Sequence, residues 1–384
     1  MSNPIGENVL FVEQQEGFDS LLPELAAGGQ LAVDTEAASF HRYSDRVYLL
    51  QLSSRERTLV VDPLEVTDFG RFGAVLADPE VEIVFHDADY DLRLLEREFG
   101  IRATNLFDTR VAAQLLDEPG IGLAALLEKY QGVTLDKRFQ RADWSRRPLS
   151  DDMLRYAATD TKHLLTLRDL LADKLAASGR TSWAAEEFAL LEDVRWGPEG
   201  DEEPAWLRLK GAKALKPREL AVLRELHAWR DEQAKRLDRA AFRVLNNEPM
   251  LAMARAMPAD LEALKAIPGI GTETISRRGA QLLAAIERGR AIPDAKLPRL
   301  ERPPRRAPDP VLEARIERLK ALRNRLAPKL GLQPGVLCPN GTLEAIARAN
   351  PQTLEELAAV PELRHWQRRE LGRELLAAVA EPAQ

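Results

Sequence analysis

Cysteine is the scarcest residue in this chain of 384 residues, which contains one, Cys338. A single thiol excludes an internal disulfide and a thiolate metal cluster. Histidine is also sparse, and the spacings of the five histidines do not match a zinc site. The sequence therefore offers neither a disulfide framework nor a zinc centre.

Long apolar runs are missing as well. The chain has no stretch of about 18 apolar residues, so no membrane span is expected. The first residues, MSNPIGENVL, lack a basic segment followed by a long apolar one, so no signal peptide is expected. The length suggests two or three domains, each able to bury a core. These features predict a soluble, cytoplasmic protein with no membrane partner.

The net charge of −7 conceals two halves of opposite sign. Residues 1–200 contain 21 Lys and Arg against 36 Asp and Glu, whereas residues 201–384 contain 33 against 25. The halves therefore carry −15 and +8. An acidic half suits divalent cations and a basic half suits polyanions. Ordinary surface variation is the alternative, because the second half is only moderately basic.

Strand and helix signals follow one another through residues 1–196, which predicts an α/β domain with a mixed sheet. Strands are expected at LAVDTEA, VYLLQLS, TLVVDP and VEIVFH. Helices are expected at DYDLRLLEREFG, TRVAAQLLD, GLAALLEKYQG and along one segment from Ser150 to Gly179. The break WGPEGDEEP begins at Trp196, and it predicts a linker over residues 197–212.

The rest of the chain is predicted to be helical and contains an internal repeat. MPADLEALKAIPGI (257–270) matches NPQTLEELAAVPEL (350–363) at an offset of 93 residues, which also pairs Arg230 with Arg323. Chance matching of Leu- and Ala-rich helices is the alternative, but the register runs without a gap. We expect two all-α domains, 213–291 and 311–384, separated by a Pro- and Arg-rich linker over 292–310.

Four acidic residues stand in unusual positions. Asp34 and Glu36 share one face at the end of a strand, although a turn after the strand would also explain them. Asp160 lies on the apolar stripe of its helix, where a carboxylate is costly unless it is paired or bound to a metal. Asp91 also lies toward the apolar face of its helix. The alternative is that it is an ordinary residue at the boundary of an amphipathic helix. Four carboxylates suit two Mg²⁺ or Mn²⁺ ions.

The order of these acids resembles a known family. Asp-x-Glu on a strand, then HDADYDL, then YAATD is similar to the DEDDy branch of 3′→5′ exonucleases. DWSRRPLS before the last motif and repeats similar to HRDC domains resemble ribonuclease D. The nuclease resemblance covers about residues 8–195 and the HRDC resemblance most of 213–382. The sister branch has a histidine where this chain has Arg155, so the tyrosine branch fits better.

The resemblance implies a ribonuclease H-like fold and a two-metal hydrolase. The catalytic residues would be Asp34, Glu36, Asp91, Tyr156 and Asp160, and all of these except Tyr156 would be metal ligands. A free tyrosine has a pKa of about 10, so Tyr156 is expected to orient a water rather than act as a base. The reaction would release 5′-monophosphates from RNA 3′ ends. The implied partners are tRNA precursors or other structured RNA with single-stranded 3′ ends.

Several residues are candidates for RNA contacts. Phe40 and Tyr43 could stack on terminal bases, with core packing as the alternative. Five basic residues in DKRFQRADWSRR could guide the phosphate backbone, or belong to a solvated loop: Lys137, Arg138, Arg141, Arg146 and Arg147. In IPGIG, Gly269 and Gly271 could let backbone amides approach a phosphate, or form a tight turn. At the positions that correspond to Gly269 and Gly271, the second repeat has Glu362 and Arg364.

Two rival functions stay open at this point. One is a 3′→5′ DNA exonuclease of the same fold, because nothing in the motifs selects ribose. The other is a non-catalytic scaffold that binds nucleic acid through the two repeats. The presence of all five catalytic-type residues argues against the scaffold.

Overall fold

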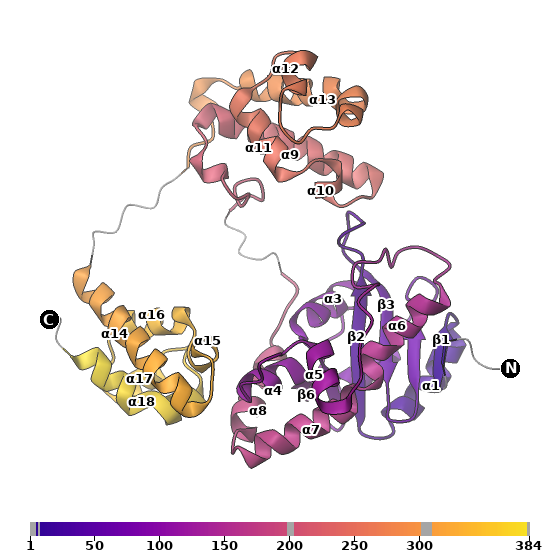
Figure 1. The fold of residues 1–384 in the computed structure, drawn as a ribbon, viewed down its shortest axis with the longest axis vertical. Helices are drawn as coiled ribbons and strands as arrows, with labels where there is room; N and C mark the ends of the chain where they lie inside the picture. The colour runs from indigo at the N-terminus through magenta and orange to yellow at the C-terminus, as the bar shows by residue number, and fades with distance from the viewer. Residues whose placement is uncertain (1–4, 7, 198–202, 301–308, 382–384) are drawn as a thin grey trace. The chain divides into compact units, whose positions relative to one another are not determined.

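The computed structural model describes residues 5–6, 8–197, 203–300 and 309–381 (Figure 1). The chain divides into two compact units. The first combines residues 1–36, 47–196 and 306–384, and the second combines residues 37–46 and 197–305. Parts of both predicted linkers lie outside the described residues. Among the described helices, none has the length and apolar character that crossing a bilayer requires.

A six-stranded sheet in the order β1-β4-β3-β2-β5-β6 forms the centre of the first unit. The strands are β1 (Val9–Val12), β2 (Gln30–Ala37), β3 (Val47–Ser53), β4 (Thr58–Val61), β5 (Glu82–Phe85) and β6 (Leu106–Asp108). The β3–β4 pair is antiparallel, whereas β1–β4, β2–β5 and β5–β6 are parallel. This mixed sheet confirms the predicted α/β class.

Helices cover both faces of the sheet. On one face, α1 (Gln15–Ala26), α2 (Gly70–Leu76) and α3 (Asp89–Phe99) form a core with Leu31 and Val33 of β2. On the other, α4 (Thr109–Leu115), α5 (Leu123–Gln131), α7 (Leu164–Ala177) and α8 (Thr181–Leu191) surround Ala32. Side chains of a strand alternate between the two faces of a sheet. Asp34 and Glu36 are therefore on the same face as Ala32 and on the opposite face from Leu31.

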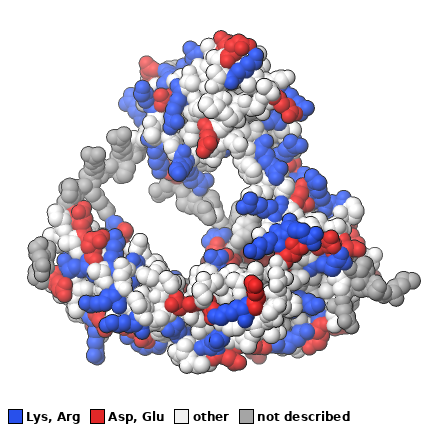
Figure 2. Space-filling model, in the orientation of Figure 1, with Lys and Arg blue, Asp and Glu red and all other residues white. Residues whose placement is uncertain are grey.

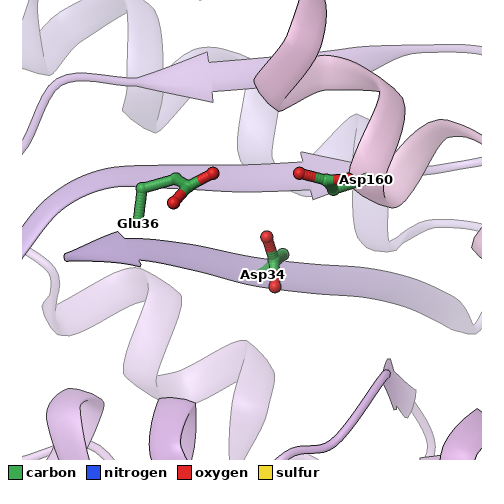
Figure 3. Close-up of side chains that lie close together, drawn as sticks. All are labelled: Asp34, Glu36 and Asp160. Atoms are coloured by element: carbon green, nitrogen blue, oxygen red, sulfur yellow. The ribbon is translucent and has the colours of Figure 1, made fainter. Parts of the chain in front are cut away.

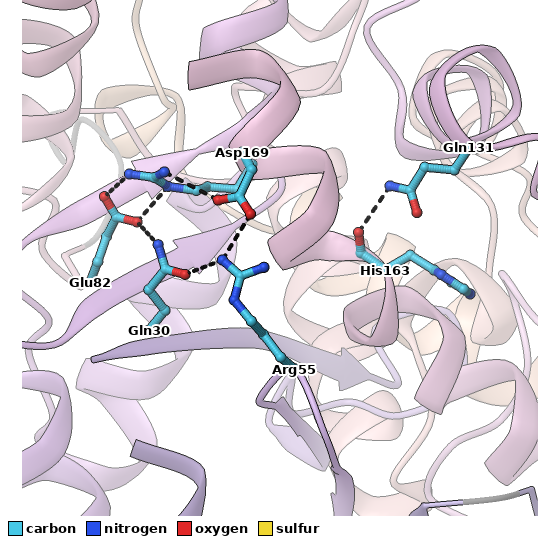
Figure 4. Close-up of polar contacts among 7 residues, drawn as sticks. Gln30, Arg55, Glu82, Gln131, His163 and Asp169 are labelled. Atoms are coloured by element: carbon cyan, nitrogen blue, oxygen red, sulfur yellow. Dashed lines mark hydrogen bonds and ion pairs between the residues drawn. The ribbon is translucent and has the colours of Figure 1, made fainter. Parts of the chain in front are cut away.

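The predicted single helix from Ser150 to Gly179 is wrong, because two helices meet at His163. The first is α6 (Asp151–Lys162), and α7 begins at Leu164. The carbonyl of His163 accepts a hydrogen bond from the side chain of Gln131 at 3.1 Å (Figure 4). This partner comes from α5, so the junction of the two helices also contacts a helix that is distant in sequence.

A polar network attaches α7 to the amino ends of β2 and β5 (Figure 4). Arg168 of α7 forms an ion pair with Glu82, which also accepts a hydrogen bond from Gln30 at 3.0 Å. Arg55 bridges the same region to Asp169 at 2.8 Å. The network holds α7 at the opposite end of β2 from Asp34 and Glu36.

The two helical domains repeat each other at the predicted offset. The first contains α9 (Pro217–Leu237), α10 (Ala241–Val244), α11 (Asn247–Ala256), α12 (Leu261–Lys265) and α13 (Thr272–Arg290). The second contains α14 (Pro310–Leu326), α15 (Pro334–Leu337), α16 (Asn340–Ala349), α17 (Leu354–Ala358) and α18 (His365–Ala380). Every helix of the second set begins 93 residues after its counterpart.

The repeat extends to individual hydrogen bonds. Arg230 donates to the carbonyl of Leu245 at 3.2 Å and to the side chain of Asn247 at 2.6 Å. Arg323 donates at 3.0 Å and 2.7 Å to the residues 93 positions after those two, Cys338 and Asn340. Arg230 is 5% exposed, and a guanidinium withdrawn from water needs such partners. The shared bonds therefore explain why both copies keep this arginine.

The second helical domain shares its core with the α/β domain. Trp366 of α18 stacks on Trp183 of α8 with ring centroids 4.6 Å apart. The Glu186 carboxylate accepts the backbone N–H groups of His365 and Trp366, at 2.6 and 3.0 Å. Arg180 donates to the carbonyls of residues 330 and 331. The α/β domain and the second repeat thus form one packed body.

Candidate active site

Three carboxylates meet at the carboxyl end of β2. Asp34 and Glu36 come from this strand and Asp160 comes from α6, and one oxygen of each lies within 4.8 Å of the others (Figure 3). The described pairing of β2 with β5 ends at Ala32, so both strand acids lie beyond that ladder. A hydrogen bond of 2.7 Å between the hydroxyls of Ser53 and Thr161 fixes α6 against β3 next to Asp160.

Crowding and burial disfavour the charged forms of these acids. Burial raises the pKa of Asp34 well above its usual value, and the charges of Asp91, Asp160 and Glu36 raise it further. The pKa of Glu36 is raised by burial, then by Asp160 and Asp91. Burial raises the pKa of Asp160 to about 7. Like charges held together in this way, with oxygen ligands only, fit a hard divalent cation.

Asp91 lies at the border of this group. It is in the first turn of α3, is 6% exposed, and accepts a hydrogen bond from the hydroxyl of Thr35. Burial raises its pKa to about 7, although the hydrogen bond from Thr35 opposes this. The structure therefore brings three of the four predicted ligands together and ties the fourth to Thr35. Sequence reasoning missed Thr35, because its contact with Asp91 joins residues 56 positions apart.

Tyr156 lies one helical turn before Asp160. Its ring contacts those of Phe139 and Trp144, with centroids 5.7 and 6.0 Å away. Burial raises the pKa of Tyr156 above its usual value of 10, and the charges of Asp160, Glu36 and Asp34 add to the rise. The hydroxyl therefore keeps its proton at neutral pH. The roles of Phe139 and Trp144 were missed, because a loop pattern does not reveal which aromatics fold back on a helix.

A pocket of about 190 Å³ opens beside these residues. Tyr156, Thr159 and Asp160 line it from α6, and Arg138 lines it from the preceding loop. Arg138 also forms an ion pair with Asp136. One of the five predicted basic contacts is thus next to the carboxylates.

Arg147 is held by contacts within the chain, and its predicted contact with RNA stays a prediction. Its guanidinium donates to Asp62 at 2.7 Å and to the carbonyls of Tyr48 and Trp144 at 2.9 and 2.8 Å. Asp62 is fully buried, so it needs this partner. Arg146 is exposed and forms an ion pair with Asp143. RNA contacts by Lys137, Arg141 and Arg146 stay predictions.

The remaining predicted contacts belong to the second unit. Phe40 is 47% exposed. Tyr43 packs against the core of the first helical domain, and its hydroxyl donates to Asp231 at 3.0 Å, which favours the core-packing interpretation. Gly269 has a φ of +81°, so a tight turn requires it. Gly271 is the N-cap residue of α13, and its contact with phosphate stays a prediction.

Family models match most of the chain. A model described as 3′-5′ exonuclease matches residues 9–176. The HRDC domain model matches residues 219–286 and 313–379. The order of these matches agrees with the α/β domain followed by the two helical repeats.

Curated relatives and solved structures agree with these matches. Ribonuclease D of Gluconacetobacter diazotrophicus is 34% identical over 90% of this chain and 86% of its own length. Ribonuclease D of Escherichia coli is 32% identical over 76% of this chain and 77% of its own. The crystal structure of E. coli RNase D, an exoribonuclease involved in structured RNA processing, superimposes with a TM-score of 0.72 at 28% identity, covering 98% of this chain and 100% of that one. For the catalytic core of RRP6 from Trypanosoma brucei the TM-score is 0.65 at 29% identity, covering 73% of this chain and 79% of that one.

Proposed function

This chain belongs to the ribonuclease D family and is a 3′→5′ exoribonuclease, and we propose that it trims tRNA precursors and other structured RNAs with single-stranded 3′ ends. The observation that carries the proposal is the group formed by Asp34, Glu36 and Asp160, whose oxygens lie within 4.8 Å of one another. The chemistry is hydrolysis of the 3′-terminal phosphodiester, with release of a 5′-monophosphate.

Four carboxylates would hold the cofactor, which we propose to be two Mg²⁺ or Mn²⁺ ions. They are Asp34, Glu36, Asp91 and Asp160. When bound, such a pair supplies a reactive water at neutral pH and stabilises charge on the attacking and leaving oxygens. The raised pKa values of these acids support the proposal, because bound cations would stabilise the charged forms that burial and then repulsion disfavour.

Tyr156 would orient the attacking water. Its raised pKa keeps the O–H intact, so it offers a hydrogen bond rather than a base. Its contacts with Phe139 and Trp144 fix the ring and restrict the directions in which the hydroxyl can point. The pocket beside Tyr156 and Asp160 is where the terminal nucleotide would bind, with Arg138 close to its phosphate.

Outside the pocket, the N-terminus of α13 is a further place for an RNA phosphate. Support comes from the other repeat, where the amides at the corresponding end of α18 bind the Glu186 carboxylate. The turn of this repeat can therefore hold an anion on backbone N–H groups. In the first repeat, Gly271 has no atom within 4 Å of where a side chain would begin, which leaves room for a phosphate.

Hydrolysis of matched oligonucleotides tests the proposal. Single-stranded RNA and DNA of one sequence, and a tRNA-like RNA with a 3′ extension, would each be incubated with Mg²⁺ and with EDTA. We expect RNA to shorten from its 3′ end, to yield 5′-monophosphates, and to remain intact in EDTA. Equal cleavage of DNA would favour the DNA exonuclease, and binding without cleavage would favour the scaffold.

A further inference from the structure

Two aromatic side chains stand together on the surface of the second unit. Phe40 is 47% exposed and Phe242 is 43% exposed, and their rings meet edge to face with centroids 6.2 Å apart. Phe40 belongs to segment 37–46 and Phe242 to α10. Arg243 joins them, because its side chain donates to the carbonyl of Phe40 and its guanidinium lies 5.9 Å from the ring of Phe242. The pair is thus held in place yet open to solvent.

Arginines gather around α10. Arg278 of α13 donates to the carbonyl of Val244 at 3.2 Å, at the end of α10. The pKa of Arg278 is lowered by burial and then by the charges of Arg239, Arg236 and Arg277, so each of these three cations lies near Arg278. Figure 2 shows basic side chains over the end of the unit that carries α10. Crowded like charges on a surface suit a polyanionic ligand.

Two of the nearby acidic side chains are bonded to segment 37–46, and a third is paired with Arg277. Asp238 is bound to Arg42 at 3.0 Å, and Asp231 accepts the Tyr43 hydroxyl. Both therefore serve to hold segment 37–46 on the helical domain. Glu273 forms an ion pair with Arg277 at 3.1 Å, but both side chains are about three-quarters exposed, so this pair is weak.

The second repeat shows that the fold does not need these residues. Its helices begin 93 residues later, in the same register. At the positions of Phe242 and Arg243 it has Gly335 and Val336. At those of Arg239, Arg277 and Arg278 it has Leu332, Glu370 and Leu371. The aromatic ring and four arginines are thus particular to the copy that does not share a core with the α/β domain.

We propose that Phe40 and Phe242 form a stacking platform for unpaired bases of RNA, with the surrounding arginines binding its phosphates. The inference rests on the proposed function only in taking RNA as the ligand. Every base has a π-face, so such a platform accepts any sequence. A duplex buries those faces, so the platform selects single-stranded segments. The arginines are Arg236, Arg239, Arg243, Arg277 and Arg278.

Binding to the full chain without divalent metal tests the platform, because EDTA prevents cleavage. The probe is a fluorescein-labelled single-stranded RNA of mixed sequence, about 12 nucleotides long. We expect Phe242→Ala to weaken its binding about tenfold, since stacking contributes roughly 1–3 kcal/mol per base. Phe242→Leu should be as weak as the alanine variant, and Phe242→Tyr should restore binding. A leucine variant that binds like the unaltered chain overturns the stacking role.

The arginines are tested by salt dependence. The double change Arg239→Gln and Arg277→Gln should lower the log–log slope of affinity against salt by about 1.4, at about 0.7 per phosphate contact to a single strand. Arg369→Gln with Arg373→Gln, on α18, is the matched control and should leave the slope unchanged. Equal effects of the two double changes would show a diffuse charge effect and overturn the arginine cluster.

The outcomes separate this inference from the proposed function. An unaltered chain that binds the probe but cleaves no RNA in Mg²⁺ contradicts the function and leaves the platform standing. An active chain whose Phe242→Ala variant binds the probe normally contradicts the platform alone. Thermal melting of each variant, together with the tyrosine rescue, distinguishes lost stacking from misfolding.

Discussion

At the scale of single residues, Asp160 connects catalysis to stability. Its ordinary pKa is 3.8 and its pKa in the folded chain is about 7. Between these values the folded carboxyl keeps a proton that the unfolded chain releases. Without metal, its contribution to stability is therefore fully present below the ordinary pKa and is lost as the pH rises through about 7.

We predict that Asp160→Asn abolishes hydrolysis and leaves the fold intact. Because asparagine carries no charge to bury, the metal-free variant should melt at a higher temperature than the unaltered chain at about pH 8, and at a similar temperature at about pH 4. Thermal melting in EDTA across this range, combined with an RNA cleavage assay, measures both effects. A variant that cleaves RNA normally would rule out Asp160 as a metal ligand.

Tyr156→Phe should lower kcat severely and leave the affinity for RNA almost unchanged. The lost hydroxyl acts on the water, not on the bound substrate, so the effect belongs to the chemical step. The ring contacts with Phe139 and Trp144 would remain, so stability should change little. Single-turnover kinetics alongside binding in EDTA separate the two quantities. A defect confined to RNA affinity would contradict this role.

The sequence predicted the acidic residues of the candidate site but not the residues that hold their side chains in position. Asp34, Glu36 and Asp160 stand out because acids at a strand end and on an apolar stripe need a partner. Thr35 is 56 positions from the Asp91 that it contacts, and no local pattern links them. Such contacts depend on how strand and helix approach each other, which only the packed structure defines.

At the scale of elements, α8 and α18 hold the second helical domain to the sheet. Trp366 is 2% exposed and stacks on Trp183, and its indole N–H donates to Glu187 at 2.9 Å. We predict that Trp366→Ala lowers the free energy of unfolding by about 3–5 kcal/mol, through lost burial and a cavity. Urea denaturation measures the change, with Arg373→Ala on the same helix as the exposed control. A loss below about 1 kcal/mol would show that α18 does not depend on this contact.

The helices of the repeats were easier to predict than the helix that carries Asp160. The offset of 93 residues locates all five helix starts of the second copy from those of the first. The break at His163 was missed because the helical pattern of apolar residues continues from α6 into α7. Repetition along the chain is visible in a sequence, whereas a short break between two helices of similar composition is not.

At the scale of the whole molecule, the two compact units do not follow the order of the domains along the chain. Among the described residues, 309–381 pack with the sheet, and segment 37–46 belongs with residues 203–300. Composition predicted linkers, but it could not show which domain packs on which. The second repeat carries Trp366 where the first has Glu273, and this difference becomes meaningful only once α8 is seen beside it.

A chain ending at Trp196 should be less stable than the full chain, even though it keeps all five catalytic residues. Removing residues 197–384 uncovers Trp183 and Phe188, which belong to the shared core. We expect a lower melting temperature and binding of a hydrophobic dye, because a large apolar patch becomes exposed. An equally stable truncated chain would show that the shared core contributes little.

The reactivity of Cys338 can report how often the second helical domain opens. The side chain of Cys338 is fully buried, so a reagent cannot reach it in the folded protein. Burial also raises the pKa of the thiol to about 12, so the reactive thiolate does not form at neutral pH. A thiol reagent can therefore react only when α15 and its neighbours open. Because the chain has no other cysteine, each modification event reports an opening of this domain. Comparing the reaction rate with and without RNA would show whether RNA binding makes opening of this domain rarer.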